Sequence, residues 1–199
     1  MKTGNVRIYL MIKLNAAQLR KGLQLTDYRL RQKQKAVSRK RNAIYIILDN
    51  VLDTYNIGSI FRLADAVAAK KVYLCGGTAT PPNPRIKKAS INTTEWVAWS
   101  YKETTVEAIN ELRTMNPKLQ LVAIEQSPRA VPYDQFEYKL PIALVVGHES
   151  DGVSKEVLDM ADAIVELPMF GVNKSLNVMV SLGIVLYKAI EKLLLSGRK

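Results

Sequence analysis

The sequence has little of the chemistry on which metal-bound and disulfide-bonded proteins depend. Its 199 residues include one cysteine, Cys75, and one histidine, His148. This excludes a disulfide framework and leaves too few ligands for a zinc site. No apolar run approaches the roughly 20 residues of a membrane-spanning helix. The apolar stretch at residues 8–12 is shorter than the roughly 7–15 residues of a secretory signal core. We therefore expect a reduced, cytoplasmic protein with neither a metal nor a membrane segment.

The chain is also not dominated by glycine or proline. Its ten glycines and eight prolines exclude a collagen-like or low-complexity chain. Hydrophobic residues make up 48% and charged residues 24%, with a mean hydropathy of -0.05. This composition is ordinary for a folded protein, and the length suffices for one domain with a full core plus an appendage.

Acidic residues are nearly missing from the N-terminal segment. Residues 1–42 hold 12 Lys and Arg against one acid, whereas residues 43–199 hold 17 of each sign, so the whole net charge of +11 lies in the first segment. Such a block contacts phosphates without reading sequence. The alternative is a solvated basic segment that serves solubility only. The concentrated charge favours RNA or DNA contact by Arg20, Lys21, Arg29, Arg31, Lys33, Lys35, Arg39, Lys40 and Arg41.

The remaining pattern predicts alternating strands and helices. Buried-strand patterns cover residues 43–48, 72–75, 96–101, 119–125, 142–146 and 163–167. Helical patterns cover residues 56–69, 106–115 and 175–195, with a short helix after Ser154 and one or two more within residues 14–41. A proline-rich loop occupies residues 80–84. The alternation predicts an α/β fold with a mostly parallel sheet and helices on both faces. We expect a basic arm at residues 1–42 and a domain at residues 43–199.

Three loops after predicted strands combine polar residues with glycine, at the sheet edge where ligands bind in parallel α/β folds. In the first loop, Asn56 stands near a helix start and Arg62 lies six residues on. An arginine at this place can bind a phosphate group. The plainer interpretation is that Asn56 caps the helix and that Arg62 forms an ion pair on the surface. In the second, Gly147 and Gly152 bracket Glu149, which suits either a ligand site or a sharp turn. It matches neither the dinucleotide fingerprint nor the P-loop, which argues against a nucleotide-dependent oxidoreductase.

The third loop joins a strand end to the start of the longest predicted helix. It runs from Leu167 to Val178 and places Ser175 and Asn177 at the helix mouth. Either side chain can donate and accept hydrogen bonds to a ligand there. An Asn at this position also commonly caps the helix, so both interpretations stay open. His148 has no second histidine as a partner, and we interpret it as structural.

Taken in order, the three loops resemble the three motifs of the SpoU/TrmH class of SPOUT RNA methyltransferases, the α/β-knot enzymes. The matching residues are Asn56 with Ile57 to Ala66, then Leu144 to Gly147 with Glu149 and Gly152, then Leu167 to Met169, Gly171 and Ser175 to Val178. The resemblance covers residues 43–190 and leaves the arm unexplained. It implies a deep C-terminal trefoil knot, an exception to the rule of unknotted chains.

The resemblance also implies an activity and a set of site residues. Members bind S-adenosylmethionine (AdoMet) against the knot, methylate ribose 2′-hydroxyls of RNA, and form homodimers whose active site draws on both subunits. By position, Gly147, Leu167, Met169 and Leu176 would bind the cofactor. The catalytic group would be Arg62, Asn56, Glu149, Ser175 and Asn177.

For the mechanism, we expect Arg62 to bind the phosphate beside the target ribose rather than to act as the base, because a guanidinium is effectively always charged. Glu149 would orient Arg62 as a charge-assisted pair. A non-catalytic RNA-binding knot protein is the alternative function, and the RNA class, tRNA or rRNA, stays open.

Overall fold

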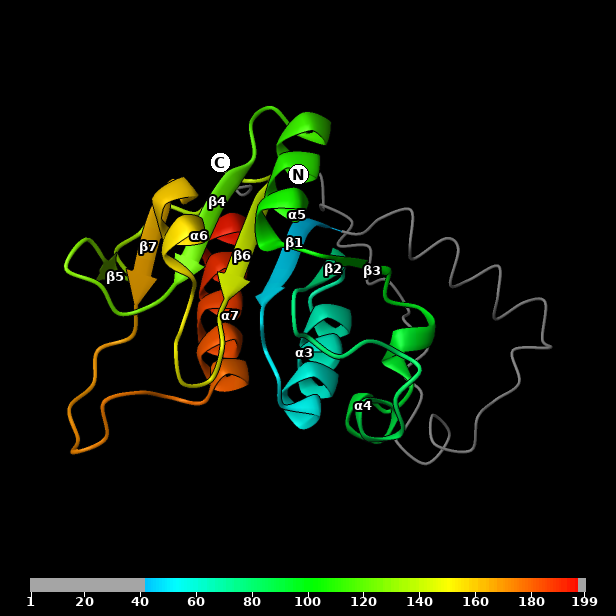
Figure 1. The fold of residues 1–199 in the computed structure, drawn as a ribbon. Coiled ribbons are helices and arrows are strands. Elements are labelled where there is room, and N and C mark those ends of the chain that lie inside the picture. Colours follow the sequence, from blue (N-terminus) through cyan, green and yellow to red (C-terminus); the bar gives the residue numbers. More distant parts are fainter. Residues whose placement is uncertain (1–41, 197–199) are drawn as a thin grey trace, which may run out of the picture.

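The computed structural model describes residues 42–196 of the chain (Figure 1). Its elements in chain order are β1 Asn42–Asp49, α3 Thr54–Ala66, β2 Ala69–Cys75, α4 Pro84–Ser90, the 3-10 helix η1 Thr93–Glu95, β3 Trp99–Lys102, α5 Thr105–Met115, β4 Gln120–Ile124, β5 Val131–Pro132, β6 Ile142–Val146, α6 Lys155–Met160, β7 Ala163–Glu166 and α7 Val178–Ser196. The helices expected within residues 14–41 and the nine basic arm residues lie outside the described part.

The strands form one seven-stranded sheet in the order β3-β2-β1-β6-β4-β7-β5. Every strand pairing is parallel, so the carboxyl ends of all the strands lie along one edge. Chain order and sheet order differ most in the second half, where β6 lies between β1 and β4. The ends of β4, β6 and β7 are thereby brought side by side.

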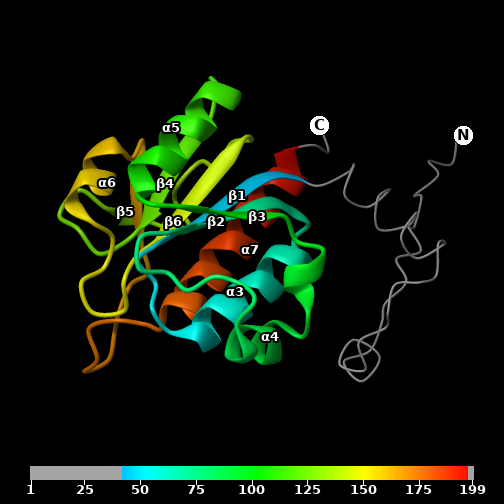
Figure 2. The ribbon, with the colours of Figure 1, turned by 45° about the vertical axis from the view of Figure 1, so that its right-hand side comes forward.

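Helices cover both faces of the sheet (Figure 2), as the strand–helix alternation predicts. On one face, α3, α4 and α7 bury Ile60, Ile86 and Leu186 against strand residues that include Ile46. On the other, α5 and α6 bury Ile109 and other apolar side chains against the alternate strand residues. The buried strands read as continuous apolar runs because both of their faces are covered.

Three local features differ from the sequence-based expectation. Helix α4 follows the proline-rich loop, with Asn83 capping its first turn and Pro84 at its first position. Its seven residues, three of them charged, are too few to show an apolar periodicity. Strand β5 is two residues long, lies at the sheet edge and falls outside every predicted strand. Helix α7 starts at Val178 rather than residue 175, because residues 175–177 belong to the preceding loop.

None of the helices in the described part is long and apolar enough to cross a bilayer. Within the same residues, no three His, Cys, Asp or Glu side chains gather as a metal site would require. Cys75 is fully buried, and desolvation is the main reason that the pKa of its thiol rises to about 12. The thiol is therefore a core group rather than a reactive one.

Candidate active site

A cavity of about 350 Å³ opens at the carboxyl edge of the sheet, where β4, β6 and β7 end and α7 begins. A cavity of this size falls at the small end of the range for small-molecule sites. Its lining combines apolar strand ends with polar loop residues. The lining residues from the strand ends and loops include Ile124, Glu125, Gln126, Val146, Gly147, Glu149, Val165, Glu166, Leu167, Met169, Ser175, Leu176 and Asn177.

All four residues assigned to the cofactor by the sequence motifs, Gly147, Leu167, Met169 and Leu176, line this cavity. Two lining residues that the motifs did not reveal are Glu125 and Gln126, directly after β4. The only signal for them is an acid that follows a buried apolar strand. Chain order could not show that this strand ends next to β6. Gln126 Nε2 donates a hydrogen bond to the backbone carbonyl of Lys174, which ties the two loops together.

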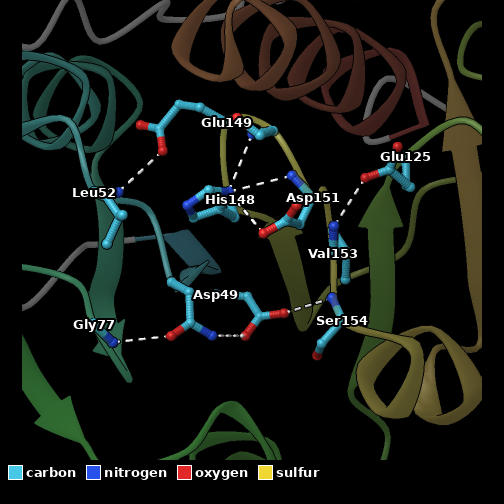
Figure 3. Close-up of polar contacts among 11 residues, drawn as sticks. Asp49, Leu52, Gly77, Glu125, His148, Glu149, Asp151, Val153 and Ser154 are labelled. Carbon is cyan, nitrogen blue, oxygen red and sulfur yellow. Dashed lines mark hydrogen bonds and ion pairs between the residues drawn. The ribbon is translucent and has the colours of Figure 1, made fainter.

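The loop after β6 folds into a tight hairpin that forms one wall of the cavity (Figure 3). His148 and Gly152 exchange two backbone hydrogen bonds of 2.9 and 3.0 Å. A Cβ on Gly147 would lie 2.1 Å from the carbonyl of Gly152, and Gly152 itself has a φ of +71°. Both positions therefore require glycine. His148 Nδ1 accepts from the backbone amides of Ser150 and Asp151, in agreement with its interpretation as structural.

Three carboxylates hold this loop in place (Figure 3). Glu125 Oε2 accepts from the amide of Val153 at 2.9 Å, and Asp49 Oδ2 accepts from the amide of Ser154 at 2.8 Å. Asp49 is only 2% exposed, and its oxygens also accept from Thr105 Oγ1 and Asn50 Nδ2, so protein groups take the place of water around it. Glu149, in the loop itself, reaches back to the segment before α3. Each carboxylate thus joins the loop to a different part of the fold.

Glu149 accepts three hydrogen bonds, from the amides of Leu52 (3.1 Å) and Asp53 (3.0 Å) and from Asn56 Nδ2 (3.1 Å). Desolvation raises the pKa of the Glu149 carboxyl, but these hydrogen bonds outweigh it and hold the pKa below its usual value. The group is therefore a fixed anion and a poor base. Within the described part of a single chain it forms no ion pair with Arg62, because backbone and amide donors occupy the carboxylate.

Asn177 connects the third motif to the first. Its Oδ1 accepts from the amides of Met179 (3.0 Å) and Val180 (3.3 Å), so it caps α7. Its Nδ2 donates to Asn56 Oδ1 at 3.0 Å, and Asn56 in turn donates to Glu149. The capping interpretation of Asn177 is therefore correct, and the residue also lines the cavity. A hydrogen-bonded chain from Asn177 through Asn56 to Glu149 joins the three motifs.

Asn56 and Arg62 lie on the same helix but in different surroundings. Asn56 is 6% exposed and does not cap α3, because Asp53 does so by accepting from the amide of Tyr55. Arg62 is exposed, does not line the cavity, and has no hydrogen-bond or ion-pair partner in the part of the chain that the structure describes. The plainer interpretation of Arg62 as a surface ion pair is therefore also wrong. Ser175 lines the cavity and is exposed.

The charge of the cavity suits a cationic ligand with an apolar part. Three carboxylates line it, those of Glu125, Glu149 and Glu166, and none of the described lining residues is Lys or Arg. Such a field attracts a sulfonium or ammonium group and repels phosphate. Apolar walls from Val146, Val165 and neighbouring residues suit a planar base. The lining therefore fits AdoMet and does not fit a nucleoside triphosphate or a dinucleotide.

Comparison with known proteins agrees with this geometry. Residues 43–187 match the SpoU rRNA Methylase family. The tRNA (guanosine(18)-2'-O)-methyltransferase of Aquifex aeolicus is 32% identical over 82% of this chain and 76% of that protein. The Escherichia coli K12 protein of the same name is 28% identical over 77% of this chain and 65% of that protein.

Solved structures give the same result. The A. aeolicus TrmH/SpoU tRNA modifying enzyme superposes with a TM-score of 0.72 at 30% identity, covering 84% of this chain and 86% of that one. An AdoMet-bound rRNA methyltransferase from Sinorhizobium meliloti gives 0.70 at 28% identity, covering 79% and 60%. With three motifs in order, a parallel α/β sheet and an acidic cavity at its carboxyl edge, the chain belongs to the SpoU methylase family of RNA methyltransferases.

Proposed function

We propose that this protein transfers a methyl group from AdoMet to a ribose 2′-hydroxyl of tRNA or rRNA, in the cytoplasm. The observation that carries the proposal is the acid-lined cavity at the carboxyl edge of the sheet. Beside it, a chain of hydrogen bonds from Asn177 through Asn56 to Glu149 connects the three motifs. Relatives named as tRNA ribose methyltransferases and a neighbouring structure with bound AdoMet support it. Backbone groups of Gly147, Leu167 and Leu176 would hold the adenosine, with Met169 beside them.

The reaction requires an aligned hydroxyl, an acceptor for its proton and the exclusion of water. When bound, AdoMet supplies an electrophilic methyl group on its sulfonium. The ribose oxygen would take this methyl group as its hydroxyl gives up a proton, and S-adenosylhomocysteine would be the second product. Ser175 and Asn177, which line the cavity where α7 begins, would hydrogen-bond the ribose or the methionine carboxylate.

Neither charged site residue is suited to take the proton. Glu149 has a lowered pKa, and a guanidinium group is too weak an acid to act as a base. We assign Arg62 to binding the phosphate next to the target ribose and to stabilising the forming alkoxide. A phosphate oxygen or a water molecule then accepts the proton. Glu149 and Asn56 act as positioning residues that hold the loop and α3 together.

We also propose that the enzyme is a homodimer with a composite active site. Arg62 lies outside the cavity of its own chain and is exposed, so it is free to serve the cavity of a second copy. Val180, Ile184 and Tyr187 form an exposed apolar stripe on α7, 37–53% accessible, on the side opposite the residues that pack on the sheet. An apolar stripe of this kind marks a protein interface.

The knot and the arm complete the proposal. The loops after β4, β6 and β7 gather around one cavity while α7 packs on β4 and β6 behind them, an arrangement compatible with a threaded C-terminal segment. We propose that this segment is the trefoil knot of the family. We propose residues 1–42 as an RNA-contacting arm and residues 43–199 as the methyltransferase domain.

The test is methyl transfer from radiolabelled AdoMet to total tRNA and, separately, to unmodified ribosomal RNA, followed by digestion to nucleosides. Wild-type protein should label a 2′-O-methyl nucleoside, and Arg62→Ala should not. A chain lacking residues 1–41, cut before β1 begins, should bind RNA more weakly yet keep its AdoMet affinity. Intact AdoMet affinity without label in either RNA would contradict the substrate assignment. Absent AdoMet binding would instead favour the non-catalytic RNA-binding alternative.

A further inference from the structure

Many cations of the folded body are neutralised by acids. Lys71 and Lys102 pair with Glu111, Arg113 with Asp162, Arg129 and Lys155 with Asp159, Lys139 with Glu137, and Lys188 with Glu191. Within residues 42–193, by contrast, four exposed cations on α3 and α4 have no acidic partner: Arg62, Arg85, Lys87 and Lys88. Their charge is therefore available to an external anion.

These four cations lie on two helices that are in direct contact (Figures 1 and 2). The helices approach so closely that a Cβ on Gly58 would lie 2.5 Å from Ala89 Cβ and 2.8 Å from the carbonyl of Ile86. Arg62 follows Gly58 by four residues, so it shares the side of α3 that faces α4. On α4, Ile86 is buried while Arg85, Lys87 and Lys88 are exposed, so the charges of this helix face solvent.

Acids on the neighbouring elements do not cancel this charge. Asp65 of α3 accepts a hydrogen bond from Trp96 Nε1 at 2.8 Å. Glu95 of η1 is exposed and makes no ion pair within the described residues. These two acids, set against four cations, leave the surface with a net positive charge. Because residues 43–199 are neutral as a whole, this local excess is a feature of the surface and not of the composition.

The surface is also aligned with the active site. Helix α3 begins beside the cavity, where Asn56 binds Glu149 and Asn177. Arg62 is six residues further, about 9 Å along the helix axis. Because Arg62 is assigned to the phosphate beside the target ribose, the cations of the adjoining α4 would hold the phosphates that follow it along the RNA.

We propose that Arg62, Arg85, Lys87 and Lys88 form an RNA-binding surface of the folded domain, which holds phosphates flanking the target nucleotide independently of the N-terminal arm. This rests on the proposed function, since it identifies where the substrate of the same site is held. Phosphate contacts by exposed Lys and Arg supply affinity that falls with salt and is independent of base sequence.

The experiment uses the full chain and the double variant Arg85→Gln/Lys88→Gln, with unmodified tRNA transcripts and unmodified ribosomal RNA as probes. Filter binding at several salt concentrations should show affinity reduced roughly tenfold and the slope of log K against log salt less negative by about 1.5, as expected for two lost phosphate contacts. The KM for RNA should rise with little change in kcat. AdoMet affinity by calorimetry and the melting temperature should be unchanged.

The matched control is Lys70→Gln/Lys118→Gln, which removes the same charge at two exposed lysines that form no ion pair within the described residues, at the start of β2 and just before β4, on the opposite edge of the sheet. It should keep wild-type RNA affinity and salt slope. If the α4 variant behaves as this control does while wild type methylates RNA, the surface assignment is wrong and the proposed function stands. If wild type binds AdoMet but neither RNA, both are overturned.

Discussion

At the residue scale, Asn177 performs two tasks that separate substitutions can distinguish. Its Oδ1 caps α7 and its Nδ2 donates to Asn56. Asn177→Ala removes both, so we expect a loss of about 1 kcal/mol in unfolding free energy together with impaired methyl transfer. Asn177→Asp keeps a capping acceptor and removes only the donor. The unfolding free energy of both variants, measured in urea, reports the contribution of the cap. The kcat for methyl transfer reports the contribution of the hydrogen bond to Asn56.

In Asn177→Asp we expect near wild-type stability with methyl transfer lowered by about tenfold or more, because the link from α7 to α3 is broken. Wild-type kcat in this variant would show that the amide donor is dispensable and that Asn177 serves α7 alone.

Arg62→Ala should affect methyl transfer but not stability. It should leave stability within about 0.5 kcal/mol, because Arg62 has no partner in the described part of the chain.

At the element scale, one carboxylate joins α5 to two strands. Glu111 of α5 accepts from Tyr73 Oη of β2 at 2.7 Å and pairs with Lys71 of β2 and Lys102 of β3. The hydrogen bond from Lys102, followed by that from Tyr73, lowers the pKa of Glu111 from 4.5 to about 2. Because the folded pKa is the lower one, the carboxylate stabilises the fold above pH 4.5, and this contribution disappears as pH falls towards 2.

We therefore expect the unfolding free energy of wild type to fall more steeply between pH 4.5 and about 2 than that of Glu111→Gln. Urea unfolding across this pH range measures both slopes. Glu107→Gln, an exposed position on the same helix, is the control and should keep the wild-type slope. Equal slopes in wild type and Glu111→Gln would mean that Glu111 does not couple α5 to the sheet.

At the scale of the whole molecule, α7 is apolar on both sides. Leu182, Val185 and Leu186 are buried against the sheet, whereas Ile184 and Tyr187 are exposed. A helix that is apolar all round is normally covered all round. If a second copy covers α7, Ile184→Glu should shift the protein to monomers in sedimentation velocity and reduce methyl transfer, with AdoMet affinity largely kept.

The control for this prediction is Met115→Glu, because Met115 is also an exposed apolar residue but lies at the end of α5, on the other face of the sheet. It should leave the oligomeric state unchanged. A wild-type chain that sediments as a monomer at micromolar concentration would contradict both the dimer and the composite site.

Local patterns in the sequence were enough for the sheet–helix alternation and for the glycine-containing loops, because strand and helix periodicity depend only on neighbouring residues. The motif resemblance located Gly147, Leu167, Met169 and Leu176, which all line the cavity. It did not predict that Glu149 accepts hydrogen bonds from Leu52, Asp53 and Asn56. Contacts across 93 or 121 residues, such as those of Asn56 with Glu149 and Asn177, have no local signature.

The sequence by itself therefore determined the α/β class, the order of the motifs and the excess charge of the first 42 residues. Only the tertiary structure decided that β4 ends between β6 and β7, which brings Glu125 into the cavity, and that the apolar stripe of Val180, Ile184 and Tyr187 faces outward. Strand order and the rotation of α7 about its axis depend on contacts between residues far apart in the chain. Local periodicity shows that α7 is apolar, but only packing decides which of its apolar residues meet the sheet and which face outward.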